Sequence, residues 1–442
     1  MSAEGGLQRQ FFEMLMESQW WSADQLRNYQ RSQLAQLLRH AKAQVPFYEH
    51  RLDAVVKPNG DIDWDRWSEI PIVKRQDMID HREAMQAREL PAGHGPTAVL
   101  HTSGSSGAPI DITSTSVATI ADLGFRWRMH RWHDLDWSKV LVSRLGRPED
   151  SQWFGSANPL GPWGPTWEEQ SKLGMAWMMD RDLPNAEVIE IYRRLDGTYL
   201  NSGAASSHIM ARDAERLGQH VEIEAILTQG NIVRNSDRLI CRRVFGASLV
   251  ETYSSKEGGQ LAHQCSDGSL HLNAEGSLLE VLDKNGQPCR PGETGRVVIT
   301  PFFQTGQPLI RYAQGDLATA GSPCSCGRHS LTLAGIAGRS ISVFSHPSGQ
   351  AKVVTYLEDG VVELLQSAHV QLAQTGPALF AVRYQPLDWA RPADEPEAAK
   401  IIRASLWDDS EIVFERRETA SRATDKVVDF VNEWDIDLLE TV

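Results

Sequence analysis

The chain contains 442 residues, of which 41 % are hydrophobic and 23 % charged, and its formal net charge is −14. This length exceeds one simple core, so we expect two unequal domains. The acidic charge argues against a surface for nucleic acid or an anionic membrane, and no apolar run reaches the length of a membrane span. An odd number of cysteines and an N-terminus without an apolar leader favour a cytoplasmic protein over a secreted disulfide framework.

The first expected elements are a helix, a short strand and a loop rich in glycine and hydroxyl groups. Apolar residues recur with helical spacing between positions 20 and 51, and Pro46 ends that pattern. Residues 97–100 form a short apolar run that predicts a strand. The loop after it contains Thr102, Ser103, Gly104, Ser105, Ser106 and Gly107. Its backbone N–H groups and hydroxyls suit the oxygens of a triphosphate, and a flexible Ser/Gly linker is the alternative.

The middle of the chain predicts a helix over residues 120–132 and a buried strand over residues 139–144. Residues 158–167 contain too many glycines and prolines for a regular element. Trp163 and Trp167 in this segment are candidates for the wall of an aromatic pocket. Packing in the hydrophobic core is the alternative role for both indoles.

Two apolar runs farther along the chain lead into polar turns. Residues 225–228 precede Gly230 and Asn231, and residues 248–250 precede a segment that contains Tyr253 and Glu257. A carboxylate such as that of Glu257 can hold Mg²⁺ against phosphate oxygens and so reduce their repulsion; a solvated loop glutamate is the alternative. Later, Asp316 lies in the sequence Arg-Tyr-Ala-Gln-Gly-Asp-Leu. The two oxygens of its carboxylate suit a vicinal diol.

Strands and turns alternate between residues 277 and 300, which predicts a small β-rich subdomain at about 260–335. Within it, four side chains supply ligands of the type that zinc prefers: Cys265, His271, Cys324 and Cys326. His263 is an alternative to His271 as the fourth ligand. We expect a closed structural zinc site, and reduced thiols without a metal are the alternative.

The C-terminal region predicts a small α+β unit. Strands are expected at residues 369–372, 378–384 and 411–416. Helices are expected at residues 395–407 and around 427–433. That order of elements suits a small lid domain.

The motifs above resemble those of the adenylate-forming superfamily, and in particular its phenylacetate–coenzyme A ligase and CapK-like branch. The resemblance extends from about residue 26 to about residue 339. It implies an α/β fold with a large N-terminal adenylate-forming domain over residues 1–338 and a smaller α+β lid domain over residues 339–442. It also implies an enzyme that uses ATP and Mg²⁺ to convert a carboxylic acid, aromatic or bulky, into an acyl-adenylate. The acyl group then passes to a thiol, and coenzyme A is the expected acceptor.

The resemblance also implies a role for each motif. The glycine-rich loop would hold the triphosphate, Glu257 would hold the magnesium ion, and Asp316 would accept hydrogen bonds from both ribose hydroxyls. Arg339 would mark the hinge before the lid. Three further residues would lie against the adenosine of ATP or AMP: Gly230, Asn231 and Tyr253. Paired cysteines followed by Gly-Arg recur in this branch, which favours the structural zinc site.

The chain departs from the pattern of the family at several places, one of which is Asn231 in place of the usual acid. Ala108 stands where many members have a lysine, and residues 340–342 are Ser-Ile-Ser where relatives place acidic residues. The position aligned with the adenylation lysine is Ala423, and Lys426 could serve as the catalytic cation if the local register is shifted.

Two alternative functions therefore stay open. One is transfer of the acyl group to an amine, a carrier protein or a reductase. The other is a non-catalytic scaffold that binds an adenylate or an acyl group. The sequence determines neither the acid, nor the acceptor, nor whether a homodimer forms.

Overall fold

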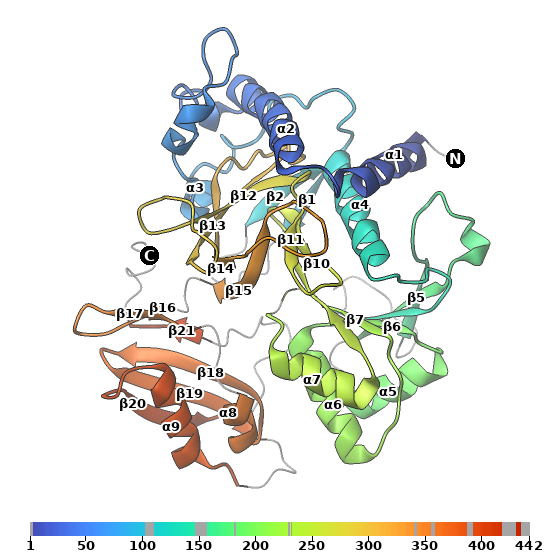
Figure 1. The fold of residues 1–442 in the computed structure, drawn as a ribbon, viewed down its shortest axis with the longest axis vertical. Coiled ribbons are helices and arrows are strands. Elements are labelled where there is room, and N and C mark those ends of the chain that lie inside the picture. The colour runs from blue at the N-terminus through green and yellow to red at the C-terminus, as the bar shows by residue number, and fades with distance from the viewer. Residues whose placement is uncertain are drawn as a thin grey trace. The chain divides into compact units, whose positions relative to one another are not determined.

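The structure is a computed structural model that describes residues 3–101, 110–145, 157–180, 183–228, 230, 232–339, 343–354, 359–386, 392–417 and 430–434. The chain divides into two compact units (Figure 1). The larger unit holds most of the chain as far as Ile336, and the smaller unit holds Gly315–Leu317 and the chain from Ala337 onward. Both contain helices and sheets, so the predicted α/β fold class is confirmed.

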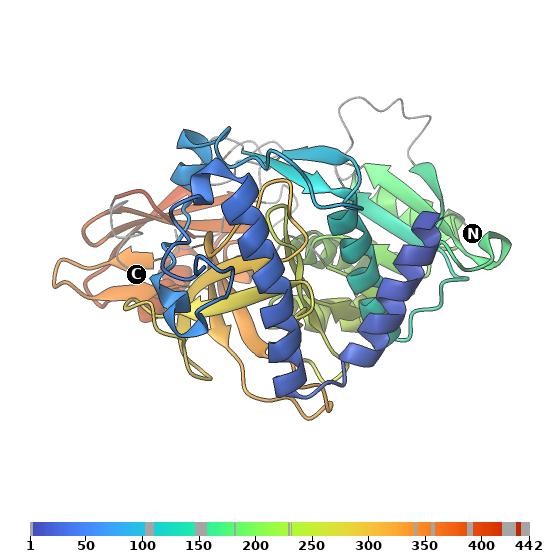
Figure 2. The ribbon, with the colours of Figure 1, turned by 90° about the horizontal axis from the view of Figure 1, so that it is seen from above.

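Two long helices open the larger unit. Helix α2 (Ala23–Gln44) begins with a capping box, in which Ser22 and Gln25 each accept a hydrogen bond from the other's backbone N–H. It ends at Val45, before Pro46, as the sequence predicts. Its apolar residues face the core, and Figure 2 shows the helix lying across the strands of one sheet. These buried residues are Leu26, Leu34, Leu37, Leu38 and Ala41.

Helix α1 (Ala3–Ser18) is not evident from the sequence pattern. It packs on α4 (Ser116–Trp132), which is the helix expected over residues 120–132. The rings of Phe11 and Phe125 meet edge to face, with centroids 5.6 Å apart. Tertiary packing therefore supports a helix that its own sequence, with Gly5 and Gly6, specifies only weakly.

A six-stranded sheet has the order β4-β5-β3-β6-β7-β8. Its strands are β3 (Leu141–Leu145), β4 (Ala157–Pro162), β5 (Met175–Asp180), β6 (Tyr199–Asn201), β7 (Ala225–Leu227) and β8 (Ser248–Val250). Helices α5 (Asn185–Arg194), α6 (Ala204–Leu217) and α7 (Asn235–Phe245) connect and cover the parallel strands (Figure 1). Neighbouring strands are parallel except for the antiparallel pair of β4 and β5.

Strand β4 corrects one expectation, because the segment that contains it was expected to have no regular element. The strand lies at the edge of the sheet, and its register shifts between Pro159 and Gly161. An edge strand tolerates proline because half of its N–H groups have no partner strand to bond. The prolines therefore disturb this strand without preventing it.

A seven-stranded sheet has the order β12-β13-β14-β15-β11-β10-β9. Its strands are β9 (Thr252–Ser255), β10 (Gly259–Gln264), β11 (Leu270–Leu272), β12 (Ser277–Leu282), β13 (Thr294–Pro301), β14 (Tyr312–Ala320) and β15 (Thr332–Arg339). This sheet is larger than the small β-rich subdomain that the sequence suggests, because β9 joins it. A separate hairpin, β1 (Thr97–His101) with β2 (Asp111–Thr115), flanks the predicted phosphate loop in the sequence.

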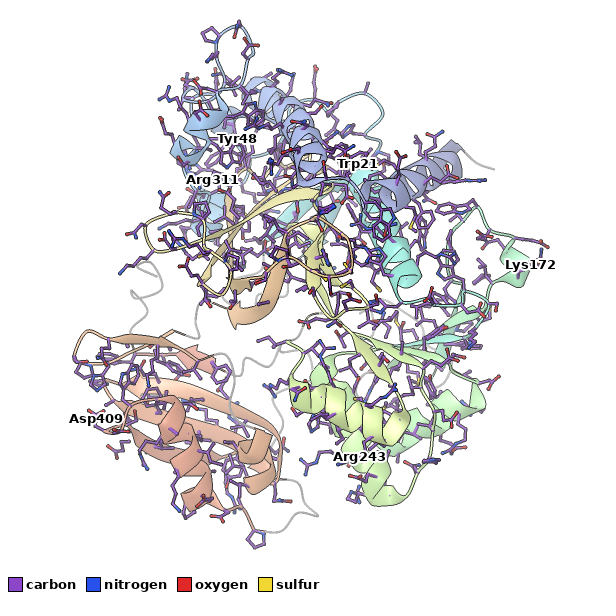
Figure 3. The ribbon with its side chains drawn as sticks, in the orientation of Figure 1. Trp21, Tyr48, Lys172, Arg243, Arg311 and Asp409 are labelled. Atoms are coloured by element: carbon purple, nitrogen blue, oxygen red, sulfur yellow. The ribbon has the colours of Figure 1, made fainter. Side chains whose placement is uncertain are left out.

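Two side chains anchor the segment before β14, and both are labelled in Figure 3. The Tyr48 hydroxyl donates to the carbonyl of Pro308 at 3.0 Å and accepts from the N–H of Ile310 at 3.1 Å. The Arg311 guanidinium lies 3.3 Å from the Glu280 carboxylate and donates to two backbone carbonyls. These contacts hold Arg311 in a backbone conformation that is rare for residues other than glycine, with a positive φ of 52°. The arginine of the Arg-Tyr motif therefore holds the backbone in place.

A buried ion pair ties helices α1 and α4 to the loop before β12. Arg128 and Glu275 are each 2 % exposed, and their nitrogen and oxygen lie 2.7 Å apart. Ser18 donates to the same carboxylate at 2.6 Å, and Arg128 also donates to Asn273 at 2.8 Å. Because a buried charge is costly without partners, these contacts fix how the three elements pack.

Where the smaller unit is described, it contains a four-stranded sheet in the order β20-β19-β18-β21, a β16-β17 hairpin and two helices. The elements are β16 (Val343–Ser345), β17 (Ala351–Val353), α8 (Asp359–Leu364), β18 (Ser367–Gly376), β19 (Leu379–Pro386), α9 (Glu395–Ser405), β20 (Glu411–Arg416) and β21 (Phe430–Asn432). The prediction of a helix around residues 427–433 is wrong from residue 430 onward, because residues 430–432 form β21, which pairs in parallel with β18. Long-range pairing overrides local preference there.

Candidate functional site

The β9–β10 hairpin carries Tyr253 and Glu257. Tyr253 is buried on β9, and Glu257 lies in the turn, where its exposed fraction is only 6 %. The turn is tight: Gly258 donates to the Ser255 hydroxyl at 2.9 Å, and a Cβ added at Gly258 would lie 2.7 Å from Leu261. A side chain at position 258 would therefore collide with the core, which explains a glycine after the glutamate.

The buried carboxylate of Glu257 has no ion-pair partner among the described residues. An ionised carboxylate inside a protein needs a cation or several hydrogen bonds. The surroundings of Glu257 are therefore compatible with the predicted magnesium ion. The role of this residue stays a prediction.

Other predicted nucleotide-binding residues lie within or after strands, or outside the described residues. Asp316 is half-buried on β14, and Gly230, with a φ of +78°, follows β7. Arg339 is the last residue of β15. The remaining ones lie outside the described residues: Thr102, Ser103, Gly104, Ser105, Ser106, Gly107, Asn231 and Lys426. Their predicted contacts with ATP are untested.

The two candidate pocket tryptophans have different surroundings. Trp163 is 7 % exposed, donates from its indole nitrogen to the carbonyl of Lys139 at 2.6 Å, and packs against Tyr199. Trp167 is partly exposed, and its ring lies 4.8 Å from that of Trp127. The contacts of Trp163 are those of an indole packed in the hydrophobic core. Trp167 is therefore the stronger candidate for a pocket wall, because part of it is exposed.

The four predicted zinc ligands come together at one end of the seven-stranded sheet. Their ligand atoms all lie within 4.8 Å of one another, and these four residues are Cys265, His271, Cys324 and Cys326. The Cys265 and Cys324 sulfurs are 3.7 Å apart, and the Cys326 sulfur is 3.3 Å from Nε2 of His271. Tetrahedral zinc with ordinary bond lengths places neighbouring ligand atoms roughly 3.5–3.8 Å apart. The cluster therefore has the dimensions of a zinc site.

The alternative ligand, His263, is engaged elsewhere. It is fully buried, its Nε2 lies 2.9 Å from the Gln260 side-chain oxygen, and its Nδ1 lies 3.4 Å from the Asn273 amide nitrogen. His271, by contrast, has Nδ1 3.1 Å from the Ser330 hydroxyl, which leaves Nε2 directed at the thiols. The structure thus favours His271 as the fourth ligand, with Ser330 orienting its ring.

Burial determines the charge states around this cluster. Burial, assisted by Arg328, lowers the pKa of His271 to about 4, so the imidazole is neutral at pH 7. Burial raises the pKa of the Cys265 thiol to about 11. A neutral imidazole is the form that binds a metal, and a bound metal would displace the thiol proton. Arg328 is the arginine of the Gly-Arg that follows the paired cysteines, whereas the sequence gave no signal for Ser330, which orients His271 only in the folded sheet.

Comparison with solved structures identifies the fold. The 2-hydroxyisobutyryl-CoA ligase in the postadenylation state, in complex with 2-HIB-AMP, matches with a TM-score of 0.72 and 16 % identity, over 95 % of this chain and 91 % of that chain. An anthranilate CoA ligase in complex with anthranoyl-AMP matches with a TM-score of 0.55 and 12 % identity, over 78 % of this chain and 68 % of that chain. The fold is thus that of the adenylate-forming CoA ligases, the class of enzyme that the motifs predict.

Sequence comparison finds a relative in the branch that the motifs resemble. Phenylacetate–coenzyme A ligase of Thermus thermophilus is 26 % identical over 337 residues, which cover 72 % of this chain and 71 % of that protein. No family model matches the chain. The predicted resemblance to the phenylacetate–coenzyme A ligase branch is confirmed.

Among the described residues, no helix is both long and apolar enough to cross a membrane.

Proposed function

We propose that the protein is a ligase that activates a carboxylic acid with ATP and then transfers the acyl group to coenzyme A. In the first step, a carboxylate oxygen attacks the α-phosphorus of ATP and the bond to pyrophosphate breaks. In the second step, the thiol sulfur of coenzyme A attacks the acyl carbon, AMP leaves, and the thiol proton passes to solvent. Neither step needs a covalent bond to the enzyme, so alignment and charge stabilisation would supply the catalysis.

One observation carries this proposal: the fold of a solved CoA ligase matches 95 % of this chain. Two of the predicted nucleotide-binding motifs, those with Glu257 and Asp316, also lie on or beside strands of one sheet. Tyr253 and Glu257 lie on the β9–β10 hairpin, and Asp316 lies on β14. The proposed roles are stacking or packing on the adenosine for Tyr253, magnesium binding for Glu257 and ribose binding for Asp316. When bound, Mg²⁺ would offset the negative charge of the phosphates.

The test is substrate-dependent pyrophosphate release from ATP, measured over a panel of carboxylic acids that includes phenylacetate, benzoate and acetate. Thioester should then form when coenzyme A is added. If acyl-adenylate forms but only an amine or a carrier protein accepts the acyl group, the alternative acceptor is correct. If AMP binds but no acid releases pyrophosphate, the protein is a non-catalytic scaffold.

Trp167 supports a preference for an aromatic or bulky acid, because its partly exposed ring offers an apolar surface. Trp167→Ala should lower kcat/KM for phenylacetate more than for acetate. Equal losses for both acids would remove this residue from the pocket.

We also propose that Cys265, His271, Cys324 and Cys326 hold one structural zinc ion. Four protein ligands leave no open position, so the ion would stabilise the sheet and take no part in the reaction. Elemental analysis of the purified protein should find about one zinc per chain. A chain that is active and contains no zinc would contradict this assignment. A homodimer and a cytoplasmic location remain predictions, and light scattering of the purified protein would test the former.

A further inference from the structure

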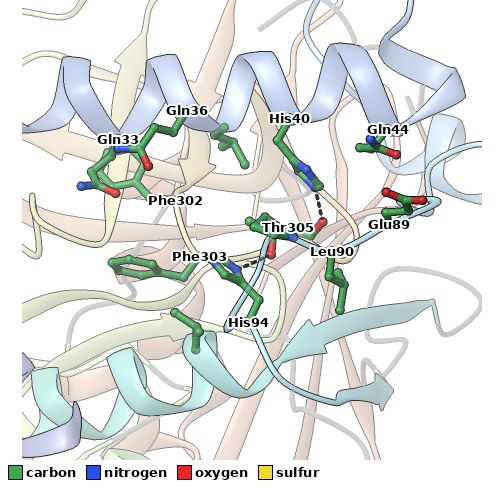
Figure 4. Close-up of a pocket in the computed structure, with 13 residues that line it drawn as sticks. Gln33, Gln36, His40, Gln44, Glu89, Leu90, His94, Phe302, Phe303 and Thr305 are labelled. Atoms are coloured by element: carbon green, nitrogen blue, oxygen red, sulfur yellow. Dashed lines mark hydrogen bonds between the residues drawn. The ribbon is translucent and has the colours of Figure 1, made fainter.

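A pocket with a volume of about 350 Å³ lies in the larger unit beside helix α2 (Figure 4). Ligand sites in proteins commonly occupy roughly 300–1,000 Å³, so this pocket can hold a small organic molecule. Its walls come from α2, the segment of residues 89–94, the start of α4 and residues 302–305. None of the predicted ligase residues lines it.

One wall of this pocket is a polar stripe along α2. Gln33, Gln36, His40 and Gln44 follow one another at spacings of three or four residues, so they share one face of the helix. Figure 4 shows all four projecting from α2 on the same side. Their side chains offer amide carbonyls and an imidazole, which accept hydrogen bonds from a ligand.

Two histidines hold Thr305 at the centre of the pocket. Nε2 of His40 lies 2.9 Å from the Thr305 carbonyl, and Nδ1 of His94 lies 2.7 Å from the Thr305 hydroxyl (Figure 4). A carbonyl only accepts, so Nε2 of His40 must carry the proton. In neutral His40, Nδ1 is then a further acceptor.

The charges of the lining point to one class of ligand. Glu89 is an acid, and none of the 13 lining residues is a lysine or an arginine. The Glu89 carboxylate has no ion-pair partner in the part of the chain that the structure describes. Burial, with His40 nearby, lowers the pKa of His94, so that imidazole adds no positive charge at pH 7. Glu89 supplies a negative charge and no lysine or arginine of the lining opposes it, so the lining favours a cation over an anion.

The apolar side chains of the lining suit the body of such a ligand. Phe302 and Phe303 belong to the wall opposite α2, and Leu90 lies near Thr305 (Figure 4). Aromatic rings attract cations as well as apolar groups. The lining therefore combines hydrogen-bond acceptors, one acid and an apolar surface.

We propose that this pocket binds a small organic cation, an ammonium group on an apolar body, with Glu89 as its counter-ion. The site is separate from the proposed ligase chemistry, because ATP, a carboxylate and coenzyme A are all anions and this lining offers them no cation. The pocket would thus be an accessory site.

Isothermal titration of the full chain tests this proposal with three benzyl probes: benzylammonium, benzyl alcohol and phenylmethanesulfonate, an anion that is not a carboxylic acid. We expect benzylammonium to bind more tightly than benzyl alcohol, and phenylmethanesulfonate to bind most weakly. No heat from benzylammonium at millimolar concentrations, or equal affinity for phenylmethanesulfonate, would overturn the proposal.

Two variants locate the binding. Glu89→Gln should weaken benzylammonium binding by roughly threefold to tenfold, since the carboxylate is exposed to solvent, and should leave benzyl alcohol unchanged. Glu83→Gln, an exposed glutamate outside the pocket, is the matched control. Gln36→Trp should fill the pocket and abolish binding, whereas Asn28→Trp, an exposed position of α2 two turns before Gln36 and outside the pocket, should not. Unchanged binding in Glu89→Gln or in Gln36→Trp would place the ligand elsewhere.

Discussion

The cysteine–histidine cluster and some of the predicted nucleotide-binding residues, among them Tyr253 and Asp316, lie in the seven-stranded sheet, yet the two sites are assembled in different ways. All four zinc ligands come from two neighbouring stretches of that sheet, the β10–β11 hairpin and the loop before β15. The nucleotide residues come from separate loops and strands, and several lie outside the described residues. The cluster is therefore complete within one sheet, whereas the nucleotide site needs distant segments of the chain.

This difference predicts two separable kinds of defect. Variants of the cluster should lower the free energy of unfolding and leave the turnover of the folded enzyme close to that of the parent. Variants of the nucleotide residues should change binding or rate and leave stability nearly unchanged. The predictions below test this separation, from the largest expected effect to the smallest.

The largest effect should follow loss of a zinc ligand. We expect Cys326→Ala to lower the free energy of unfolding by more than about 4 kcal/mol, because loss of a structural metal is among the most destabilising changes known in proteins. Chemical unfolding and elemental analysis measure the loss. Cys289→Ala, which removes a thiol outside the cluster, is the matched control. If Cys326→Ala keeps its stability but loses turnover, the cluster takes part in catalysis and the proposed separation of structural and catalytic sites is wrong.

The second effect concerns the predicted catalytic cation. Lys426→Ala should slow acyl-adenylate formation by about 10²–10³-fold, because a cation stabilises charge on the transferring phosphate. Thioester formation from pre-made acyl-adenylate should change little, since no pyrophosphate leaves in that step. Pyrophosphate exchange and single-turnover thioester assays separate the two steps. Unchanged exchange in a double Arg422→Ala, Lys426→Ala variant would exclude both residues from adenylation.

The third effect concerns ribose binding. Asp316→Ala should weaken ATP and AMP binding by about 1.5–3 kcal/mol, because both ribose hydroxyls lose a charged acceptor. Equilibrium binding of AMP measures this loss, and the unfolding midpoint should stay near that of the parent. Glu257→Gln is the contrasting variant: it should bind AMP normally and lose the magnesium-dependent step. Parent-like behaviour in both variants would remove these residues from the nucleotide site.

The smallest effect is a pH dependence of stability in the larger unit. His130 is buried beside Trp163, and burial lowers its pKa to about 3. The unfolded chain binds a proton at about pH 6.5, so this group stabilises the fold above that pH and loses its contribution as pH falls. The free energy of unfolding should therefore fall by about 1.4 kcal/mol per pH unit below pH 6.5 from this group alone. In His130→Gln, the free energy of unfolding should therefore depend less steeply on pH, by about 1.4 kcal/mol per pH unit. Denaturant titrations between pH 6.5 and 5 measure this difference.

A His130→Gln variant with the slope of the parent would mean that His130 is protonated in the folded state. The Trp137 indole donates to Nδ1 of His130 at 3.2 Å, which requires an unprotonated nitrogen there. The slope therefore tests a specific hydrogen bond as well as burial.

Several elements could be predicted because local patterns dominate them. Helix α2 has a regular apolar period and a terminating proline, so the sequence predicts the helix and its C-terminal end. Its first residue comes from the structure, in which Ser22 caps the helix. Strands β7 and β8 are continuous apolar runs at the places expected. The C-terminal strand β21 could not be predicted, because its partner strand β18 is far away in the sequence. Strand β4 pairs with the nearby β5, but its prolines and glycine indicate an irregular segment, so the sequence pattern does not predict it.

The sequence by itself determined the class of the protein, through motifs whose side chains suit the binding of phosphate, ribose and metal. It also determined the kinds of zinc ligand, but not which histidine completes the set. Tertiary structure decided that: β11 pairs with β10 on one side and β15 on the other, which brings His271 to the cysteines, while His263 bonds to Gln260. Likewise, the polar stripe of α2 has the pattern of a solvated helix face, and only packing against residues 302–305 makes it the wall of a pocket. The physical reason is common to both cases: residue types set which bonds can form, and long-range packing sets which partners are within reach.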